Sequence, residues 1–455
     1  MPRQNHLLSV VNRYKSRSRS VASFQIRSES TFTKWLNKAS NIFKVIATPD
    51  DANPLRVQEK NDIYLLLHSL KIRERLAKDP TSTIIDQFEP ATVDLKKQGV
   101  LKLSNYKLRG HLQNEINPDI VDILLCFEKV VDEIPHEVGH LHEEEILKEH
   151  EYTATRLLSA PSDSPQKDFL KRKLGALETL MSFYGWTDNP TQPDWELYAH
   201  STDEHKKRDD FGYDGSSSDP QILSGMRDYQ TINMCRSVRI RQQLGYSSIT
   251  LKSTIRGVGR GVFVDGECTV GRLLAFVPGE VWPKEHLEKL ASDTQLMEHF
   301  SHNQNYQLFG RGDGLLVDAR RSPYTVLDHD FSNPWAIGHI ANHPPKGGEI
   351  NCRKVPINFV ERDFKEIMHF VPNTFARKPD LLGQGALQME IVAMYGLGLM
   401  SRLNICDQEI YYNYRLNPVA GRDYKGPPIP EWFHEEFKSL EEPEQPEETQ
   451  QMKEL

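Results

Sequence analysis

The chain has 455 residues, a formal net charge of −8 and a mean hydropathy of −0.58. With 38% hydrophobic residues, a chain of this length can bury a sizeable core and is long enough for two domains. It contains no long apolar run, which argues against a membrane span, and its acidic balance gives no general reason for nucleic-acid binding. We therefore expect neither a membrane partner nor direct contact with nucleic acid.

The N-terminal segment is basic. Residues 1–48 hold nine Lys or Arg and a single acidic residue, Glu29, among many serines. This composition resembles a mitochondrial transit peptide, and we treat residues 1–50 as a basic leader of that kind. A disordered basic tail or a nuclear signal at residues 15–20 remains an alternative, so the expected location is mitochondrial, with nuclear or cytoplasmic as the other possibilities.

Residues 51–200 are predicted to form a helical region. Asn117-Pro118 and Ser164-Pro165 are each typical of a helix start, with a capping side chain followed by a proline in the first turn. Apolar residues at helical spacing follow the second of these starts, and such a stripe usually faces a core. Its members are Phe169, Leu170, Leu174, Leu177, Leu180 and Met181.

Composition divides the rest of the chain. Residues 201–219, rich in charged and small polar side chains, are expected to be a linker, and residues 220–245 a connecting helix that ends near a glycine. Residues 419–455 are expected to be an acidic tail, largely disordered, because eight Glu lie in the last 22 positions. The five cysteines are scattered and odd in number, which suits a reducing compartment.

One segment reads literally as a zinc motif. His136-Glu137-x-x-His140 on a helix would place two imidazoles on one face, with Glu137 as the base of a metalloprotease. Pro135 lies at a predicted helix start, but Gly139 weakens that helix. A third protein ligand is missing at the expected spacings, where Glu143 and Ile146 stand. A metalloprotease is therefore the least favoured interpretation.

Three motifs in the second half bear on function. Glycines occupy positions 257, 259 and 261, where they permit positive φ and let backbone approach a ligand closely. Asn342-His343 follows, ahead of a proline- and glycine-rich turn, and residues 409–414 form a tyrosine-rich, β-favouring box. Each motif alone also fits an ordinary hairpin, a polar turn or a packed strand.

Taken together and in this order, the motifs resemble the SET domain, the fold of most protein-lysine methyltransferases. The resemblance covers residues 246–418 and is closest to the subfamily of SET domain-containing protein 9. It implies an α+β chain, in which a β-rich SET fold of short strands with a threaded C-terminal segment follows an α-helical N-terminal region. Segments that extend the resemblance include Gly279-Glu280, Asp318, residues 333–338, Asn351-Cys352 and residues 371–373.

The resemblance implies that S-adenosylmethionine is the cofactor and that a lysine of a protein substrate accepts the methyl group. It makes Tyr414 the catalytic phenol and places Tyr412 and Phe276 in the wall of the lysine channel. No metal is implied. The cofactor-binding residues carried over by the resemblance are Gly257, Gly259, Arg260, Gly261, Asn342 and His343.

The implied reaction sets clear chemical needs. A lysine amine must lose its proton before it attacks, and with an ordinary pKa of about 10.4 this costs roughly 4 to 5 kcal/mol at pH 7. A narrow, aromatic and water-poor channel disfavours the ammonium and orients the lone pair. Because tyrosine is a poor base at this pH, we assign Tyr414 orientation and electrostatic support.

The chain departs from the family at two places. Pro344-Pro345 and a glycine loop stand where the family has Ser-Cys and a short Pro-Asn-Cys run, and Phe276 stands where it often has tyrosine. These departures favour an alternative in which the SET domain is a catalytically silent scaffold that binds a partner. The favoured function is S-adenosylmethionine-dependent methylation of a protein lysine.

The purified protein should contain no stoichiometric zinc, because His136 and His140 lack a third ligand and no cysteine lies beyond Cys406. Elemental analysis of the purified chain measures this directly. About one zinc per chain, lost on His136→Ala, would restore the metalloprotease interpretation.

Overall fold

The computed structural model describes residues 54–135, 137–187, 220–256, 258–282, 308–311, 315–319, 333–345, 348–375 and 393–414. The chain divides into two compact units, Met1–Asp62 and Ile63–Leu455, and only the start of one helix is described in the first unit. The predicted leader (1–50), linker (201–219) and acidic tail (419–455) lie outside the described residues.

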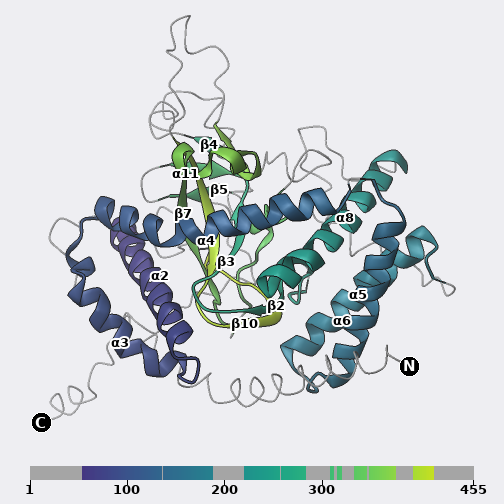
Figure 1. Cartoon of the computed structure of the whole chain (residues 1–455), viewed down its shortest axis with the longest axis horizontal. Coiled ribbons are helices and arrows are strands. Elements are labelled where there is room, and N and C mark those ends of the chain that lie inside the picture. Colours follow the sequence, from purple (N-terminus) through teal and green to yellow (C-terminus); the bar gives the residue numbers. More distant parts are fainter. Residues whose placement is uncertain are drawn as a thin grey trace, which may run out of the picture. The chain divides into compact units, whose positions relative to one another are not determined.

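The N-terminal part of the described chain is helical, as predicted (Figure 1). Helix α6 begins at the predicted place, where Ser164 accepts a hydrogen bond from the backbone of Lys167 and Pro165 occupies the first turn. No helix in the described part of the chain has the length and apolar character that a membrane crossing needs. The helices are α2 (Pro54–Lys78), α3 (Ile84–Lys97), α4 (Asn105–Glu133), α5 (His140–Ser159), α6 (Pro165–Tyr184) and α8 (Pro220–Leu244), with a short 3-10 turn η1 (Val100–Lys102).

The predicted helix start at Asn117-Pro118 is wrong. Both residues lie inside α4, which continues through the proline. Proline at this position removes one backbone hydrogen bond, but the Asn117 side chain accepts a hydrogen bond from Gln113 one turn earlier, within the same helix. Ile116 and Ile120 on either side are fully buried, so packing of the apolar face outweighs the local signal for a boundary.

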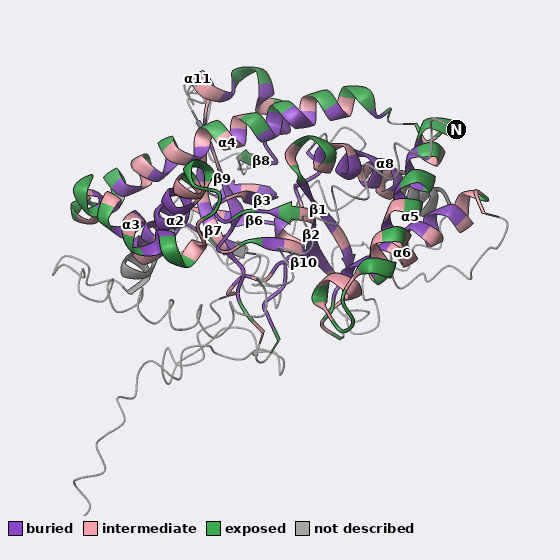
Figure 2. Cartoon of the chain, turned by 60° about the horizontal axis from the view of Figure 1, so that its bottom comes forward, coloured by how far each residue is buried: buried purple, intermediate pink, exposed green. Residues whose placement is uncertain are grey.

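In the part of the chain that the structure describes, ten short strands form three small sheets, with the orders β1-β2-β10, β3-β9-β7 and β5-β6-β4-β8. The α+β class predicted from the sequence is confirmed. In Figure 2 the strands consist largely of buried residues, whereas α5 and α6 each expose one side. The strands are β1 (Tyr246–Lys252), β2 (Arg260–Cys268), β3 (Leu273–Val277), β4 (Gly279–Trp282), β5 (Leu308–Gly310), β6 (Leu316–Asp318), β7 (Cys352–Val360), β8 (Asn373–Phe375), β9 (Ala393–Ser401) and β10 (Ile405–Glu409).

Helix α6 packs its predicted apolar stripe on the first sheet. Phe169 and Leu170 are fully buried and belong to one cluster with Ile249 and Leu251 of β1 and Phe263 of β2. The Phe169 and Phe263 rings lie 5.9 Å apart. The stripe is therefore core, as expected, and it joins the helical region to the sheet that carries the glycine turn.

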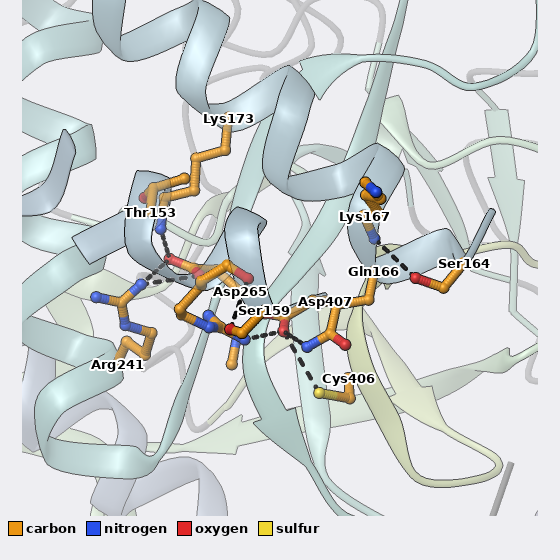
Figure 3. A network of polar contacts seen from close by, with 12 residues as sticks. Thr153, Ser159, Ser164, Gln166, Lys167, Lys173, Arg241, Asp265, Cys406 and Asp407 are labelled. Atoms are coloured by element: carbon orange, nitrogen blue, oxygen red, sulfur yellow. Dashed lines mark hydrogen bonds and ion pairs between the residues drawn. The ribbon is translucent and has the colours of Figure 1, made fainter. Parts of the chain in front are cut away.

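A buried ion network reinforces this contact (Figure 3). Lys173 of α6, itself fully buried, donates to Glu149 of α5 at 2.5 Å and to Asp265 of β2 at 2.6 Å. Arg241 of α8 bonds to the same two carboxylates. Although burial alone would raise the pKa of Asp265, the charges of Lys173 and Arg241 lower it to about 2. Three helices are thus bound to one strand through paired charges.

A second buried carboxylate links the helices to β10. Asp407 accepts hydrogen bonds from Arg156 of α5 and from Gln166 of α6, and from the backbone of Gly266 at 2.9 Å. It occupies a bulge of β10 with φ of 49°, a conformation that Asp tolerates better than most residues. The bulge lies two residues before Glu409, so the helical region fixes the backbone that leads into the tyrosine box.

Lys173→Met should lower the free energy of unfolding by about 3 to 5 kcal/mol, because it leaves Glu149 and Asp265 buried with one cation between them. Lys148→Met is the matched control. Lys148 pairs with Glu144 on the surface of α5, both side chains being more than half exposed, and its loss should change stability by less than about 1 kcal/mol. Urea unfolding of both variants measures the difference; equal losses would contradict the assignment of the network as a structural core.

Candidate functional site

The glycine turn connects β1 and β2, which pair in antiparallel register from Tyr246–Gly266 to Lys252–Arg260. Gly259 has a φ of 76°, a conformation that favours glycine, and its carbonyl accepts the backbone N–H of Ser253 at 2.8 Å. Gly257 lies outside the described residues. The turn therefore requires glycine at position 259 for its own geometry.

Glu409, at the end of β10, is the centre of the polar contacts around this turn. Its side chain is only 2% exposed. One carboxylate oxygen accepts from Ser253 Oγ at 2.7 Å and from Asn342 Nδ2 at 3.0 Å. The other accepts from the backbone and hydroxyl of Thr254 at 2.8 and 2.7 Å, and from Tyr411 OH at 2.9 Å. No cation pairs with it among the described residues, so donors alone satisfy the carboxylate.

Gly261 leaves the space that this carboxylate fills. A Cβ at position 261 would stand 2.1 Å from Glu409 Oε1, closer than real Cβ contacts come, and 3.1 Å from Asn342 Nδ2, which is a tight contact. The packing of the protein itself therefore requires glycine at position 261, independently of any ligand that the backbone there also binds.

Asn342 connects the Asn-His motif to the glycine turn by hydrogen bonds. Its side-chain amide donates to the Arg260 carbonyl at 3.0 Å, to Ser253 Oγ at 3.2 Å and to Glu409 at 3.0 Å. The residue is 8% exposed. Within the described part of the chain no residue donates to its Oδ1, which leaves one acceptor of this buried amide for a ligand.

The tyrosine box threads between two other segments. Tyr411 forms an isolated parallel bridge with Asn342, and the N–H of Tyr412 donates to the Asn342 carbonyl at 3.0 Å. On its other side, the Tyr411 carbonyl accepts the N–H groups of Asn351 and Cys352 at 3.2 and 3.1 Å. Only Glu409 of the box belongs to a regular strand, because the chain changes partners after β10 ends.

Tyr414 is held against the Asn-His motif. Its hydroxyl donates to the Ala341 carbonyl at 3.0 Å, and its N–H donates to His343 Nδ1 at 3.4 Å. The rings of His343 and Tyr414 lie 5.8 Å apart, and His343 is 2% exposed. The phenol and the imidazole are therefore oriented by the same short stretch of backbone.

Tyr412 continues an aromatic row. Its ring lies 4.9 Å from the ring of Tyr414 and 6.2 Å from that of Phe309 in β5. The side chain is 3% exposed, and burial raises the pKa of its phenol well above the ordinary value, so it stays neutral. No described residue hydrogen-bonds to its hydroxyl.

The structure brings together most of the site residues predicted from the sequence, but Phe276 lies apart from them. Phe276 on β3 is fully buried and packs against Phe359 of β7, with ring centroids 6.1 Å apart, and none of the described ring contacts joins it to the tyrosine box. The residues brought together are Gly259, Arg260, Gly261, Asn342, His343, Tyr412 and Tyr414.

Sequence reasoning missed Ser253, Phe309 and Glu409 as site residues. Ser253 and Phe309 carry no signal, since both are common residues in β-favouring surroundings. Glu409 carries a weak one: it is a carboxylate inside a β-favouring, tyrosine-rich run with no basic residue near it in sequence until Arg415. A carboxylate in such a run needs hydrogen-bond donors when the run is buried in the folded protein.

Of the described residues of the rival zinc motif, only His140 lies on a helix. Helix α4 ends at Glu133 and α5 begins only at His140, with Gly139 as its N-cap, so the predicted helix start at Pro135 is wrong. Gly139 favours the extended conformation found there, since it loses most by entering a helix. His136 lies outside the described residues, and no group of three metal-binding side chains occurs among those that are described.

No model of a protein family matches the chain, and no curated protein matches it. Among solved structures, the chain is similar to CpSET8 from Cryptosporidium, at 12% sequence identity and a TM-score of 0.22, over 55% of this chain and 98% of that one. At this TM-score the likeness supports no argument about function, which has to come from the residues of the site.

Gly261→Ala should disrupt the site, because the added methyl group would displace the Glu409 carboxylate from its donors. We expect a loss of about 2 to 4 kcal/mol in the free energy of unfolding. Gly175→Ala in α6 is the matched control: nothing lies within 4 Å of its added Cβ, and it should stabilise the protein by about 0.5 to 1 kcal/mol. Chemical denaturation measures both, and a Gly261→Ala protein as stable as the wild type would contradict the packing described.

Proposed function

We propose that the chain is a methyltransferase of the SET type, which transfers the methyl group of S-adenosylmethionine to a lysine of a protein substrate. The observation that carries the proposal is the meeting of the three motifs. Asn342 bonds to the backbone of the glycine turn and to Glu409 at the start of the tyrosine box, while His343 and Ala341 hold Tyr414. Motifs up to about 150 residues apart in sequence thus share one centre.

The residues present fit the cofactor that the proposal requires. No described residue donates to Asn342 Oδ1, which can receive a hydrogen bond from a ligand donor, and the half-buried residues Gly259 and Arg260 lie at the same turn. His343 would complete this side of the site. The bound cofactor would supply a sulfonium-activated methyl group, and these residues would hold it in place.

The acceptor lysine would lie along the aromatic row. The rings of Phe309 and Tyr412 are buried and that of Tyr414 is half-buried, and an apolar surrounding of this kind disfavours an ammonium relative to a neutral amine. No described residue hydrogen-bonds to the Tyr412 hydroxyl. It can therefore accept a hydrogen bond from the lysine amine and so orient the lone pair of that amine. We propose that Phe276 also forms part of the channel wall, although its described ring contact is with Phe359.

Tyr414 would act as an orienting and electrostatic group. Its hydroxyl donates to the Ala341 carbonyl, which holds the phenol in one orientation. An oxygen dipole fixed in this way stabilises a methyl group that carries partial positive charge during transfer. Proton removal from the amine would fall to solvent, since a neutral tyrosine is a poor base.

One observation favours the alternative, a silent SET scaffold that binds a partner. The donors of Asn342 and the space above Gly261 are all used within the protein, and the loop after His343 departs from the family at Pro344-Pro345. A site built only for structure would have the same contacts. Calorimetric titration with S-adenosylmethionine separates the two functions, because a scaffold has no need to bind the cofactor.

Tyr414→Phe should reduce methyl transfer by at least about a hundredfold while changing cofactor affinity by no more than a few-fold, because its hydroxyl acts in the transition state. The measurement is transfer of labelled methyl to proteins of a cell lysate, with mass spectrometry of the labelled bands, beside calorimetry with S-adenosylmethionine. Full activity in the Tyr414→Phe protein would show that another residue of the box is catalytic or that the proposed function is wrong.

Asn342→Ala is the companion variant and should have the opposite pattern, weakening cofactor binding first, by about 1 to 3 kcal/mol. Because this change also removes donors from Glu409, a thermal melt must show that the variant is folded at the temperature of the assay.

A further inference from the structure

Lys354 on β7 lies beside the proposed channel. Its ammonium stands 5.8 Å from the centroid of the Phe309 ring, and Phe309 in turn lies against Tyr412. Side chains two apart on a strand share a face, and on this face Cys352 donates its thiol hydrogen to the Tyr411 carbonyl at 3.3 Å. The Lys354 amine is therefore on the side of β7 that carries the tyrosine box.

Among the described residues no carboxylate pairs with this lysine. Lys173, which is fully buried, shows the contrast, because Glu149 and Asp265 both pair with it. For Lys354 the ring of Phe309 is the described partner, and burial lowers its pKa to about 8. At pH 8 about half of the Lys354 amines are then neutral, against roughly one in 250 for a lysine with the ordinary pKa of about 10.4.

A neutral amine against an aromatic wall is the state that a methyl acceptor needs. Lysine has a flexible four-carbon stem, so rotation about its side-chain bonds moves the amine along the row from Phe309 toward Tyr412 without a change in the strand. Lys173 also lies near an aromatic ring, 6.0 Å from the centroid of Phe169, but two buried carboxylates pair with its amine.

We propose that Lys354 is an internal methyl acceptor, modified by the chain's own centre; this rests on the proposed function. The Lys354 nitrogen would attack the methyl carbon of S-adenosylmethionine. A nitrogen–carbon bond forms as the sulfur–carbon bond breaks, the sulfonium becomes the neutral thioether of S-adenosylhomocysteine, and the proton remaining on nitrogen passes to solvent. Because the acceptor belongs to the same chain, the reaction needs no second protein.

The test is incubation of the purified full-length protein with S-adenosylmethionine that carries a deuterated methyl group, followed by peptide mass spectrometry. We expect label on Lys354, accumulating at a first-order rate that does not depend on protein concentration. The rate should rise as the pH increases through about 8, as Lys354 loses its proton. Lys354→Arg should remove this label, and the matched control Lys365→Arg, at an exposed lysine, should keep it.

The outcomes distinguish this inference from the function on which it rests. Label found only on other lysines or other proteins would overturn the role of Lys354 and leave the methyltransferase standing. Absence of both label and calorimetric binding of S-adenosylmethionine would overturn the proposed function and the inference with it. A rate proportional to protein concentration would show transfer between molecules, and label that persists in Tyr414→Phe would show chemical methylation outside the centre; either result would overturn the inference.

Discussion

The burial of the Glu409 carboxylate is the constraint on which the candidate site depends. A carboxylate removed from water must find donors, and here they come from a turn, from the Asn-His motif and from the tyrosine that follows it. Gly261 must lack a side chain to leave room for it. One desolvated group therefore determines where three segments lie, and this explains why a glycine, an amide and a phenol so far apart in sequence meet at one point.

The helical region takes part in the same arrangement. Lys173 and Arg241 bind Asp265 of β2, and Arg156 and Gln166 bind Asp407 of β10. These two strands carry Gly261 and Glu409, so the helices hold the strands on both sides of the carboxylate in register. Buried pairs of this kind are costly to break but add little over apolar packing, and their value lies in specifying one arrangement.

Lys173 and Lys354 show how different surroundings can give one residue type two roles. Two buried carboxylates pair with Lys173, which serves as a structural cation. The aromatic ring beside Lys354 gives no such support, and its amine loses its proton more easily. The sequence does not show this difference between the two lysines, because each of them stands beside an arginine.

The sequence by itself determined the α+β class, the start of α6 at Ser164-Pro165, the apolar stripe of that helix and the order of the motifs, because each depends on neighbours within a few turns or on pattern alone. Local rules failed at Pro118, inside a helix whose buried apolar face outweighs the proline signal. They failed also at Pro135, where Gly139 keeps the chain from entering a helix before His140. Only the tertiary structure decided that Glu409 fills the space above Gly261, that Phe276 packs with Phe359, and that two carboxylates pair with Lys173. Each of these depends on strand register and on contacts between segments far apart in the chain, and no local pattern encodes such contacts.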